Sequence, residues 1–275
     1  FICQMSYLSL KWYLESSYPV IREKYYYSKT FIQSETRARF FIWQLLTNFI
    51  QFKYLRTSIE RASYGFILSM FKTDKTVRAS FILMMIIPFA LTMFALITNQ
   101  LYSPFGAALT STQPVFHISI LITTFIVLNT ALYSIRISNF SSAAWVYDAY
   151  PLGSIKSFKN GIRKFFVIRF IIPVCLLLFI VMILRLPLHY AAVHILFLFT
   201  SLGLYNSLYN AFTKVLPFTR ENNIINSLQR LTSIILPIIF GALMSAVMIF
   251  AYKTIETAFI VSLAILVVTF WFNYI

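Results

Sequence analysis

The sequence predicts an all-α polytopic membrane protein, a bundle of about six transmembrane helices with a cytoplasmic N-terminal helical region. Of the 275 residues, 59% are hydrophobic and only 11% are charged, whereas soluble domains carry about 25% charge. Several apolar stretches have the roughly 20 residues that a helix needs to cross the hydrocarbon core of a bilayer. These stretches do not alternate apolar and polar residues as the strands of a membrane barrel would, so we expect helices.

Two regions are expected along the chain. Residues 80–275 form the six-helix transmembrane domain, and the more polar residues 1–79 form a cytoplasmic or interfacial amphipathic helical region. Within the latter, apolar residues recur at helical spacing over Phe41–Ile50, a helix too short to span a bilayer. Two placements fit this helix equally. It either packs on the bundle or lies in the membrane interface, with headgroup contacts from Arg37, Arg39, Lys53 and Arg56.

Six apolar segments are expected to span the membrane, at about 81–97, 115–133, 165–184, 188–208, 231–251 and 257–275. Three of them contain a proline, Pro88, Pro173 or Pro237, and we expect helix kinks there because neighbouring helices can satisfy the freed carbonyls. The pairs Gly203–Ser207 and Gly241–Ser245 have the small-xxx-small spacing that lets helices approach closely.

The distribution of Lys and Arg predicts the orientation of these segments. Basic residues gather before the first span and in the connectors between spans two and three and between spans four and five. The opposite connectors contain only Arg185 and Lys253. The positive-inside rule therefore predicts that both ends of the chain are cytoplasmic. Lys164 and Arg169, at the start of the third span, are expected to anchor it at the interface.

The same topology explains the net charge of +15 through contact with anionic lipid, so no nucleic-acid partner is expected. The chain begins at Phe1 and ends inside an apolar run at Ile275, so we expect it to be part of a longer protein.

No catalytic or metal-binding residues are predicted. The sequence has no paired carboxylates, no nucleophile motif and no phosphate-binding loop, so the chain is not expected to be an enzyme or to bind a cofactor. Cys3 and Cys175 are expected to be ordinary thiols. His117 is expected to be structural, with no ligand partner. His189 and His194 are five residues apart and do not share a helical face, which argues against a metal pair.

The only long interruption of the apolar series is Ser141–Lys164, which we interpret as a cytoplasmic elbow between spans two and three. A short helix is expected over Ser142–Tyr150, ended by Pro151. Trp145 suits a membrane interface, and Asp148 is an acid on a predominantly basic side. The residues alone leave two interpretations, an anchor helix in the interface or a lever that transmits force from a soluble partner to both spans.

The segment before the first span and the elbow together resemble the permease (transmembrane) subunits of bacterial ATP-binding-cassette exporters of the type-2 class. Such permeases show a basic segment with an Asp before a span, and an AAW-[IV]-Y-x-x-x-P motif followed by a Gly and a basic helix start. The matching positions are Lys72, Asp74, Lys75, Arg78, Ala143, Ala144, Trp145, Val146, Tyr147, Pro151, Gly161 and Lys164. The long polar region 1–79 departs from the pattern and would be the connector from a missing N-terminal half.

The resemblance implies a permease component of an ATP-driven (ABC-type) exporter in the bacterial cytoplasmic (inner) membrane. Its partners would be a separate ATPase subunit, which binds the ATP and Mg²⁺, and a second permease half or a second copy of the chain. The aromatic-rich, acid-poor composition favours a lipid-like or amphipathic substrate. The residues implied to couple to the ATPase are Ala143, Ala144, Trp145, Tyr147, Asp148, Tyr150 and Pro151. The alternative function is a non-transporting scaffold or assembly subunit of a larger membrane complex.

Overall fold

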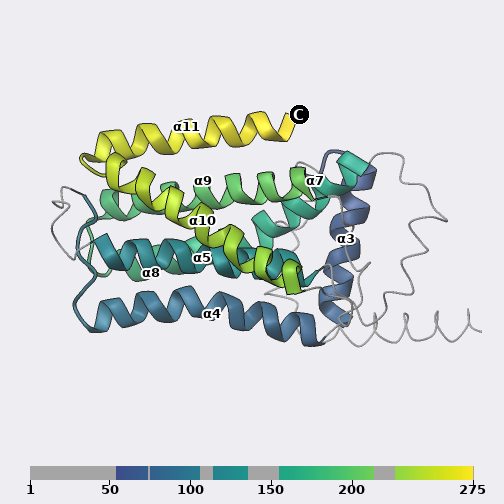
Figure 1. Ribbon diagram of the computed structural model, residues 1–275, viewed down its shortest axis with the longest axis horizontal. Coiled ribbons are helices and arrows are strands. Elements are labelled where there is room, and N and C mark those ends of the chain that lie inside the picture. The colour runs from purple at the N-terminus through teal and green to yellow at the C-terminus, as the bar shows by residue number, and fades with distance from the viewer. Residues whose placement is uncertain (1–53, 74, 106–113, 136–154, 214–226, 275) are drawn as a thin grey trace, which may run out of the picture. The chain divides into compact units, whose positions relative to one another are not determined.

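The computed structural model describes residues 54–73, 75–105, 114–135, 155–213 and 227–274 (Figure 1). The chain divides into two compact units, residues 1–56 and 57–275, and the helices below belong to the second. They are α3 (Ser58–Thr73), α4 (Lys75–Ile97), α5 (Pro114–Ser134), α7 (Ile155–Phe166), η3 (Val167–Ile171), α8 (Ile172–Met182), α9 (Leu188–Phe212), α10 (Ser227–Ala251) and α11 (Ile255–Tyr274).

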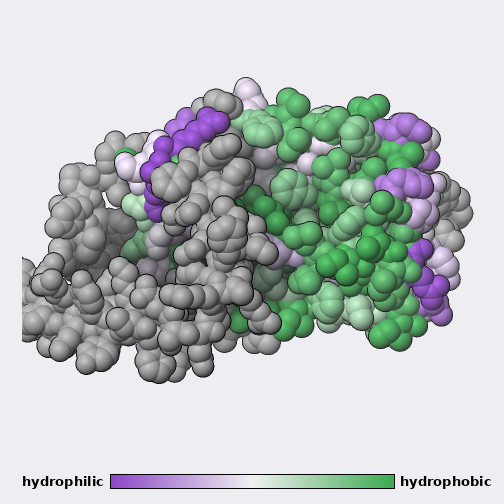
Figure 2. All heavy atoms as spheres, turned by 180° about the vertical axis from the view of Figure 1, so that it is seen from behind, coloured by the Kyte–Doolittle hydropathy of each residue, from purple (hydrophilic) through white to green (hydrophobic). Residues whose placement is uncertain are grey.

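Four stretches of helix are long and apolar enough to cross a membrane: Val115–Ser134, Ile155–Met182, Leu188–Phe212 and Ile255–Phe272. Shorter apolar stretches occupy Met85–Ile97 in α4 and Ile235–Ala251 in α10. The predicted all-α class is therefore confirmed for the described residues, with four candidate spans. A broad apolar area covers the side of the molecule in Figure 2, and hydrophilic residues lie on both sides of it, along the right edge and at the upper left, as expected for helices embedded in lipid.

The long helices lie side by side, and each packs on a small number of neighbours (Figure 1). α4 contacts α5 and α8, α10 packs along α5, and α11 packs mainly against α9. Most of α11 is exposed, including Phe259, Val267 and Trp271. By contrast, α3 runs across one end of the bundle, where it packs on α7.

The third predicted span begins earlier than expected. The structure forms one continuous helix from Ile155 through α7, η3 and α8, rather than a helix that begins at about Phe165. The physical reason lies in α7, whose buried residues Phe158, Gly161, Ile162 and Phe165 recur every three or four positions. The second half of the elbow is thus an amphipathic helix, because its apolar face can pack although its mean hydropathy is too low for lipid.

The π-helical turn η3 separates the two parts of this helix. Pro173 has no N–H to bond the carbonyl of Arg169, and directly before it the Ile172 N–H bonds the Val167 carbonyl, five residues back. Pro88 and Pro237 lie buried inside α4 and α10, both of which continue through them. The predicted kinks themselves stay predictions.

Several predicted features fall outside the described residues. These are the helix at 41–50, the first half of the elbow at 141–154, and the residues Arg37, Arg39, Lys53, Ala143, Ala144, Trp145, Tyr147, Asp148, Tyr150 and Pro151.

Candidate functional site

The first of two polar regions joins α3 to α7 and is called the charged end here; it comprises Glu60, Tyr64, Gly161, Lys164 and Arg169. At its centre the Lys164 ammonium donates to the Glu60 carboxylate, with 2.6 Å between Nζ and Oε2. Both side chains are almost fully buried. The two opposite charges compensate each other away from water, and the loss of one member of such a buried pair is strongly destabilising.

The position of Glu60 follows from the start of α3. Thr57 precedes the helix, and its hydroxyl oxygen accepts a hydrogen bond from the Glu60 N–H at 3.1 Å, which caps the first turn. An acidic side chain in that turn also faces the positive end of the helix dipole. Local sequence therefore places the carboxylate, and α7 supplies its counter-charge.

Gly161 allows α3 and α7 to approach closely enough for that ion pair. A Cβ atom at this position would lie 1.8 Å from the Ser63 hydroxyl oxygen and 2.6 Å from the Glu60 carbonyl oxygen. Such distances exclude any side chain unless the helices move apart. Gly65, one turn further along α3, has nothing within 4 Å of its Cβ position.

Further polar contacts join α7 and η3 to their neighbours. The Arg169 Nε donates to the Tyr64 hydroxyl at 3.2 Å, and the Tyr64 ring meets Phe165 edge-on. Lys164 and Arg169, predicted as interface anchors, thus both engage α3. A role for these two side chains at lipid headgroups stays a prediction, as does that of the largely unburied Arg56.

α7 is also tied to the end of α9. The Lys159 ammonium donates to the Thr213 carbonyl at 2.5 Å, and the Asn206 amide donates to the Arg163 carbonyl at 3.1 Å. α7 is therefore fixed on two sides, by α3 and by α9, at the point where it leads into a candidate span.

The second polar region lies at the opposite end of the bundle and brings together His117 of α5 and His194 of α9. The His117 Nδ1 and His194 Nε2 atoms are 3.3 Å apart, and both rings are buried. His194 Nδ1 lies 2.8 Å from the Tyr252 hydroxyl, and His117 Nε2 lies 2.8 Å from the Tyr102 carbonyl oxygen. The sequence leads us to expect His117 to be structural and without a ligand partner, and it does not reveal that a second histidine, His194, lies against it.

These contacts determine which ring nitrogens carry protons. The Tyr102 carbonyl can only accept, so His117 must carry its proton on Nε2 and leave Nδ1 free to accept. His194 then donates from Nε2 to His117 and accepts on Nδ1 from the Tyr252 hydroxyl. Burial raises the pKa of that hydroxyl well above its usual range, so it stays a neutral donor. We call this chain of three donors, Tyr252 to His194 to His117 to the Tyr102 carbonyl, the histidine relay.

Two tight turns bring the ends of the relay into place. α4 ends at Ile97, and two residues later Asn99 has a φ of 57°, which belongs to the left-handed region. The Asn99 N–H bonds the Leu96 carbonyl and the Gln100 N–H bonds the Ala95 carbonyl, the paired pattern that closes a helix C-terminus. The chain then passes over α5, where Tyr102 meets His117.

On the other side, the Tyr252 N–H bonds the Met248 carbonyl at 2.9 Å and extends the last turn of α10. Thr254 and Thr257 cap the start of α11 through mutual hydrogen bonds. The Phe105 ring stacks on Tyr252, with 4.7 Å between centroids, and lies 5.1 Å from Tyr190. The relay is therefore covered by residues that belong to the segment after α4.

Between the two ends, the core joins α5, α9 and α10. The buried Tyr205 hydroxyl donates to Asn129 Oδ1 at 2.7 Å, and its ring packs against Phe125 and Phe240. A Cβ at Gly241 would lie 3.3 Å from the Ile122 Cα, so α10 and α5 approach closely here. At Gly203 the nearest atom would be 3.8 Å away, which is ordinary contact.

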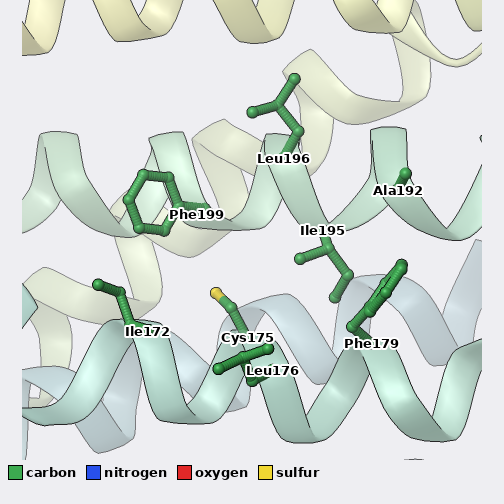
Figure 3. A pocket seen from close by; sticks show the side chains of 8 residues that line it. All are labelled: Ile172, Cys175, Leu176, Phe179, Ala192, Ile195, Leu196 and Phe199. Carbon is green, nitrogen blue, oxygen red and sulfur yellow. The ribbon is translucent and has the colours of Figure 1, made fainter. Parts of the chain in front are cut away.

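An apolar hollow of about 340 Å³ lies between α8 and α9 (Figure 3). In Figure 3 the side chains of the two helices point toward one another across it, with the Cys175 thiol between them. The lining consists of Ile172, Cys175, Leu176, Phe179, Ala192, Ile195, Leu196 and Phe199. Ile172, Leu176 and Ala192 are exposed, so the hollow opens on the outer face of the bundle.

The chemistry of these regions is that of charge pairing and hydrogen bonding. Among the described residues, no group of three or more His, Cys, Asp or Glu side chains could hold a metal ion. His189 is exposed and does not join the relay. Comparisons with protein-family models, curated proteins and solved structures found no match. The chain is a helical protein with four candidate membrane spans, and the resemblance to exporter permeases rests on the motif residues alone.

Proposed function

We propose that the chain is the membrane-spanning permease component of an ATP-driven ABC-type exporter and works with a separate ATPase subunit. In this proposal α4 and α10 also span the bilayer, which gives six spans with the charged end toward the cytoplasm. The elbow then lies where a cytoplasmic ATPase can bind it.

The observation that supports this proposal best is the continuity of α7 with α8. The segment that follows the elbow is not a loose linker but the start of a 28-residue helix that continues into a candidate span. At its base this helix is held by the Glu60–Lys164 pair and by the close contact at Gly161. A force applied to the elbow would move α3 and α8 together, because interlocked helices shift as units rather than bend.

The substrate in this proposal is lipid-like or amphipathic. The hollow between α8 and α9 is lined only by apolar side chains and the Cys175 thiol, and it opens on the outer face of the bundle. Such a surface accepts an acyl chain or another apolar group from the bilayer, and it offers no partner to a small cation.

Co-purification tests the proposal. The tagged full-length protein, extracted from its native membranes in mild detergent, should retain an ATPase subunit and hydrolyse ATP. Deletion of Ser142–Tyr150 should abolish that association. Gly161→Ala should leave the ATPase bound but reduce substrate-stimulated ATP turnover severalfold. Gly65→Ala, on the partner helix α3 and facing open space, should not. Failure to retain any ATPase would reject the proposal.

The alternative is a non-transporting scaffold subunit, in which the elbow is a static contact. Substitution of Trp145 and Asp148 would then disturb assembly of the complex without any change in ATP turnover by the remaining subunits. Equal turnover with and without the chain, in a complex that still assembles, would favour this alternative.

A further inference from the structure

We propose that the histidine relay is a proton-binding site that holds residues 100–105, which follow α4, against this end of the bundle and releases them when the site takes up a proton. The inference does not depend on the proposed transport function. It rests on the geometry of three hydrogen bonds between four separate parts of the chain.

The relay is fully satisfied only when it carries no extra proton. In the neutral form each donor meets one acceptor, from Tyr252 through His194 and His117 to the Tyr102 carbonyl. A proton added to His117 Nδ1 would face the His194 Nε2–H across 3.3 Å, with two donors and no acceptor between them. A proton added to His194 Nδ1 would face the Tyr252 hydroxyl, which must then turn its own hydrogen away. The first addition breaks one of the three bonds, whereas the second reverses one and leaves the buried Tyr252 hydrogen without its acceptor.

The surroundings offer little to stabilise an added charge. Other titratable or charged groups at this end are Tyr102 and Tyr190 and the exposed Arg185, His189, Lys253 and Glu256. Among the described residues, none of these side chains forms a hydrogen bond or an ion pair with either imidazole. The rings are packed instead by aromatic neighbours, with His194 edge-on to Tyr252 and Phe197 against the same tyrosine. A buried imidazolium without a carboxylate partner is strongly disfavoured.

The broken bond has a mechanical consequence because the relay ends on backbone. The Tyr102 carbonyl is held by His117, and Phe105 is held by its stack on Tyr252. Both contacts therefore depend on the positions of relay residues. Protonation that displaces either ring frees the segment 100–105 from the ends of α5 and α10.

A nitroxide spin label at position 102 measures this release. Tyr102 contributes its carbonyl, and its side chain is 50% exposed, so Tyr102→Cys keeps the relay intact while it offers a site for the label. Cys3 and Cys175 are replaced by serine and alanine to avoid labelling elsewhere. With the full chain in lipid nanodiscs, we expect the mobile fraction of the label to rise at least threefold between pH 7.5 and pH 4.0, because burial of an imidazole disfavours its charged form.

Two variants separate the relay from general effects of acid. The double variant His117→Gln with His194→Gln, in which neither relay position titrates, should remove the pH response. His189→Gln, which changes an exposed histidine at the same end of the same helix, should retain it. A parent protein without a pH response, a response that the double variant retains, or a response that His189→Gln abolishes would overturn the proposal.

A second measurement needs no substitution in the relay. Nitrogen-15 spectra of the histidine rings at pH 7.5 should show two neutral rings protonated on Nε2, assigned to His117 and His194 by their loss in the corresponding glutamine variants. A proton on Nδ1 of either ring would contradict the donor order and the proposal with it.

Discussion

The charged end and the histidine relay both hold distant parts of the chain together, but they do so with opposite chemistry. Glu60 and Lys164 are 104 positions apart and join as full opposite charges. His117 and His194 are 77 positions apart and join as neutral groups, ordered by which atom donates to which. The first contact is stabilised by charge compensation. The second is stabilised because each hydrogen-bond donor meets one acceptor. Loss of one member should therefore leave a buried charge in the first case and an unfilled lone pair in the second.

The largest effect is expected for Lys164→Met. This change removes the Lys164 ammonium from the buried ion pair with Glu60, and breaking such a pair costs about 3–5 kcal/mol of unfolding free energy. Chemical unfolding in detergent micelles, followed by circular dichroism, measures the loss. The double variant Glu60→Gln with Lys164→Met should recover most of it, because no charge then remains unpaired. Equal losses in the single and double variants would show that charge compensation does not hold this end together.

Gly161→Ala should follow, with a loss of about 3 kcal/mol, at the upper end of the usual range for overpacked contacts. The new methyl group would collide with backbone at the Glu60 carbonyl, and backbone yields less easily than a flexible side chain. Gly65→Ala is the matched control on the partner helix and should be neutral or stabilising by up to about 1 kcal/mol, as expected for alanine in a helix. If both variants unfolded alike, the close approach of α3 and α7 would be refuted.

At the other end, Tyr252→Phe should cost about 1.5 kcal/mol, because His194 Nδ1 loses its donor in a buried site. Tyr190→Phe is the matched control. Tyr190 contacts the same Phe105 ring but donates no hydrogen bond to the relay, so its change should stay within about 0.5 kcal/mol. The same unfolding assay ranks both variants against Lys164→Met. A loss as large as that of Lys164→Met would remove the contrast between the two ends.

The smallest difference concerns the two small-residue pairs in the spans. Gly203→Ala should gain up to about 1 kcal/mol from helix propensity, since its methyl group fits. Gly241→Ala should gain nothing, because Ile122 must shift by a few tenths of an ångström to admit the methyl group. Melting temperatures of the two variants, measured side by side, test this order. A more stable Gly241→Ala protein would show that α10 and α5 pack more loosely than the structure indicates.

Composition and apolar length were sufficient to predict the helices of the bundle. The second span was predicted at 115–133 and is the helix Pro114–Ser134; the fourth was predicted from position 188 and begins there. These helices are uniformly apolar, so hydropathy alone marks where they begin. The start of α7 was missed because its residues are half polar, and only its period of three to four positions distinguishes it from a loop.

The partners within the polar regions could not be predicted in the same way. A histidine that bonds another helix leaves no local pattern, and the sequence argument considered only histidines close together in the chain, such as His189 and His194. One signal was present. The alternation of spans already placed the start of the second span, the start of the fourth and the end of the fifth on one side of the membrane. His117, His194 and Tyr252 occupy those three places, and the remaining step, their contact, requires the packing of α5 on α9 and α10.

The π-helical turn at Val167–Ile171 interrupts the helix Ile155–Met182, so that α7 and α8 can direct their buried residues toward different sides. Before it, buried positions run through Phe158, Ile162 and Phe165; after it they run through Val174, Leu178 and Val181, which an undisturbed helix would not present on the same side. The extra residue in that turn changes the rotation of α8 relative to α7, and with it the direction in which the buried face of α8 points. Deletion of one residue from this turn would rotate α8 by about 100° around its own axis relative to α7. The apolar positions of α8 that now pack on neighbouring helices would then face away from them.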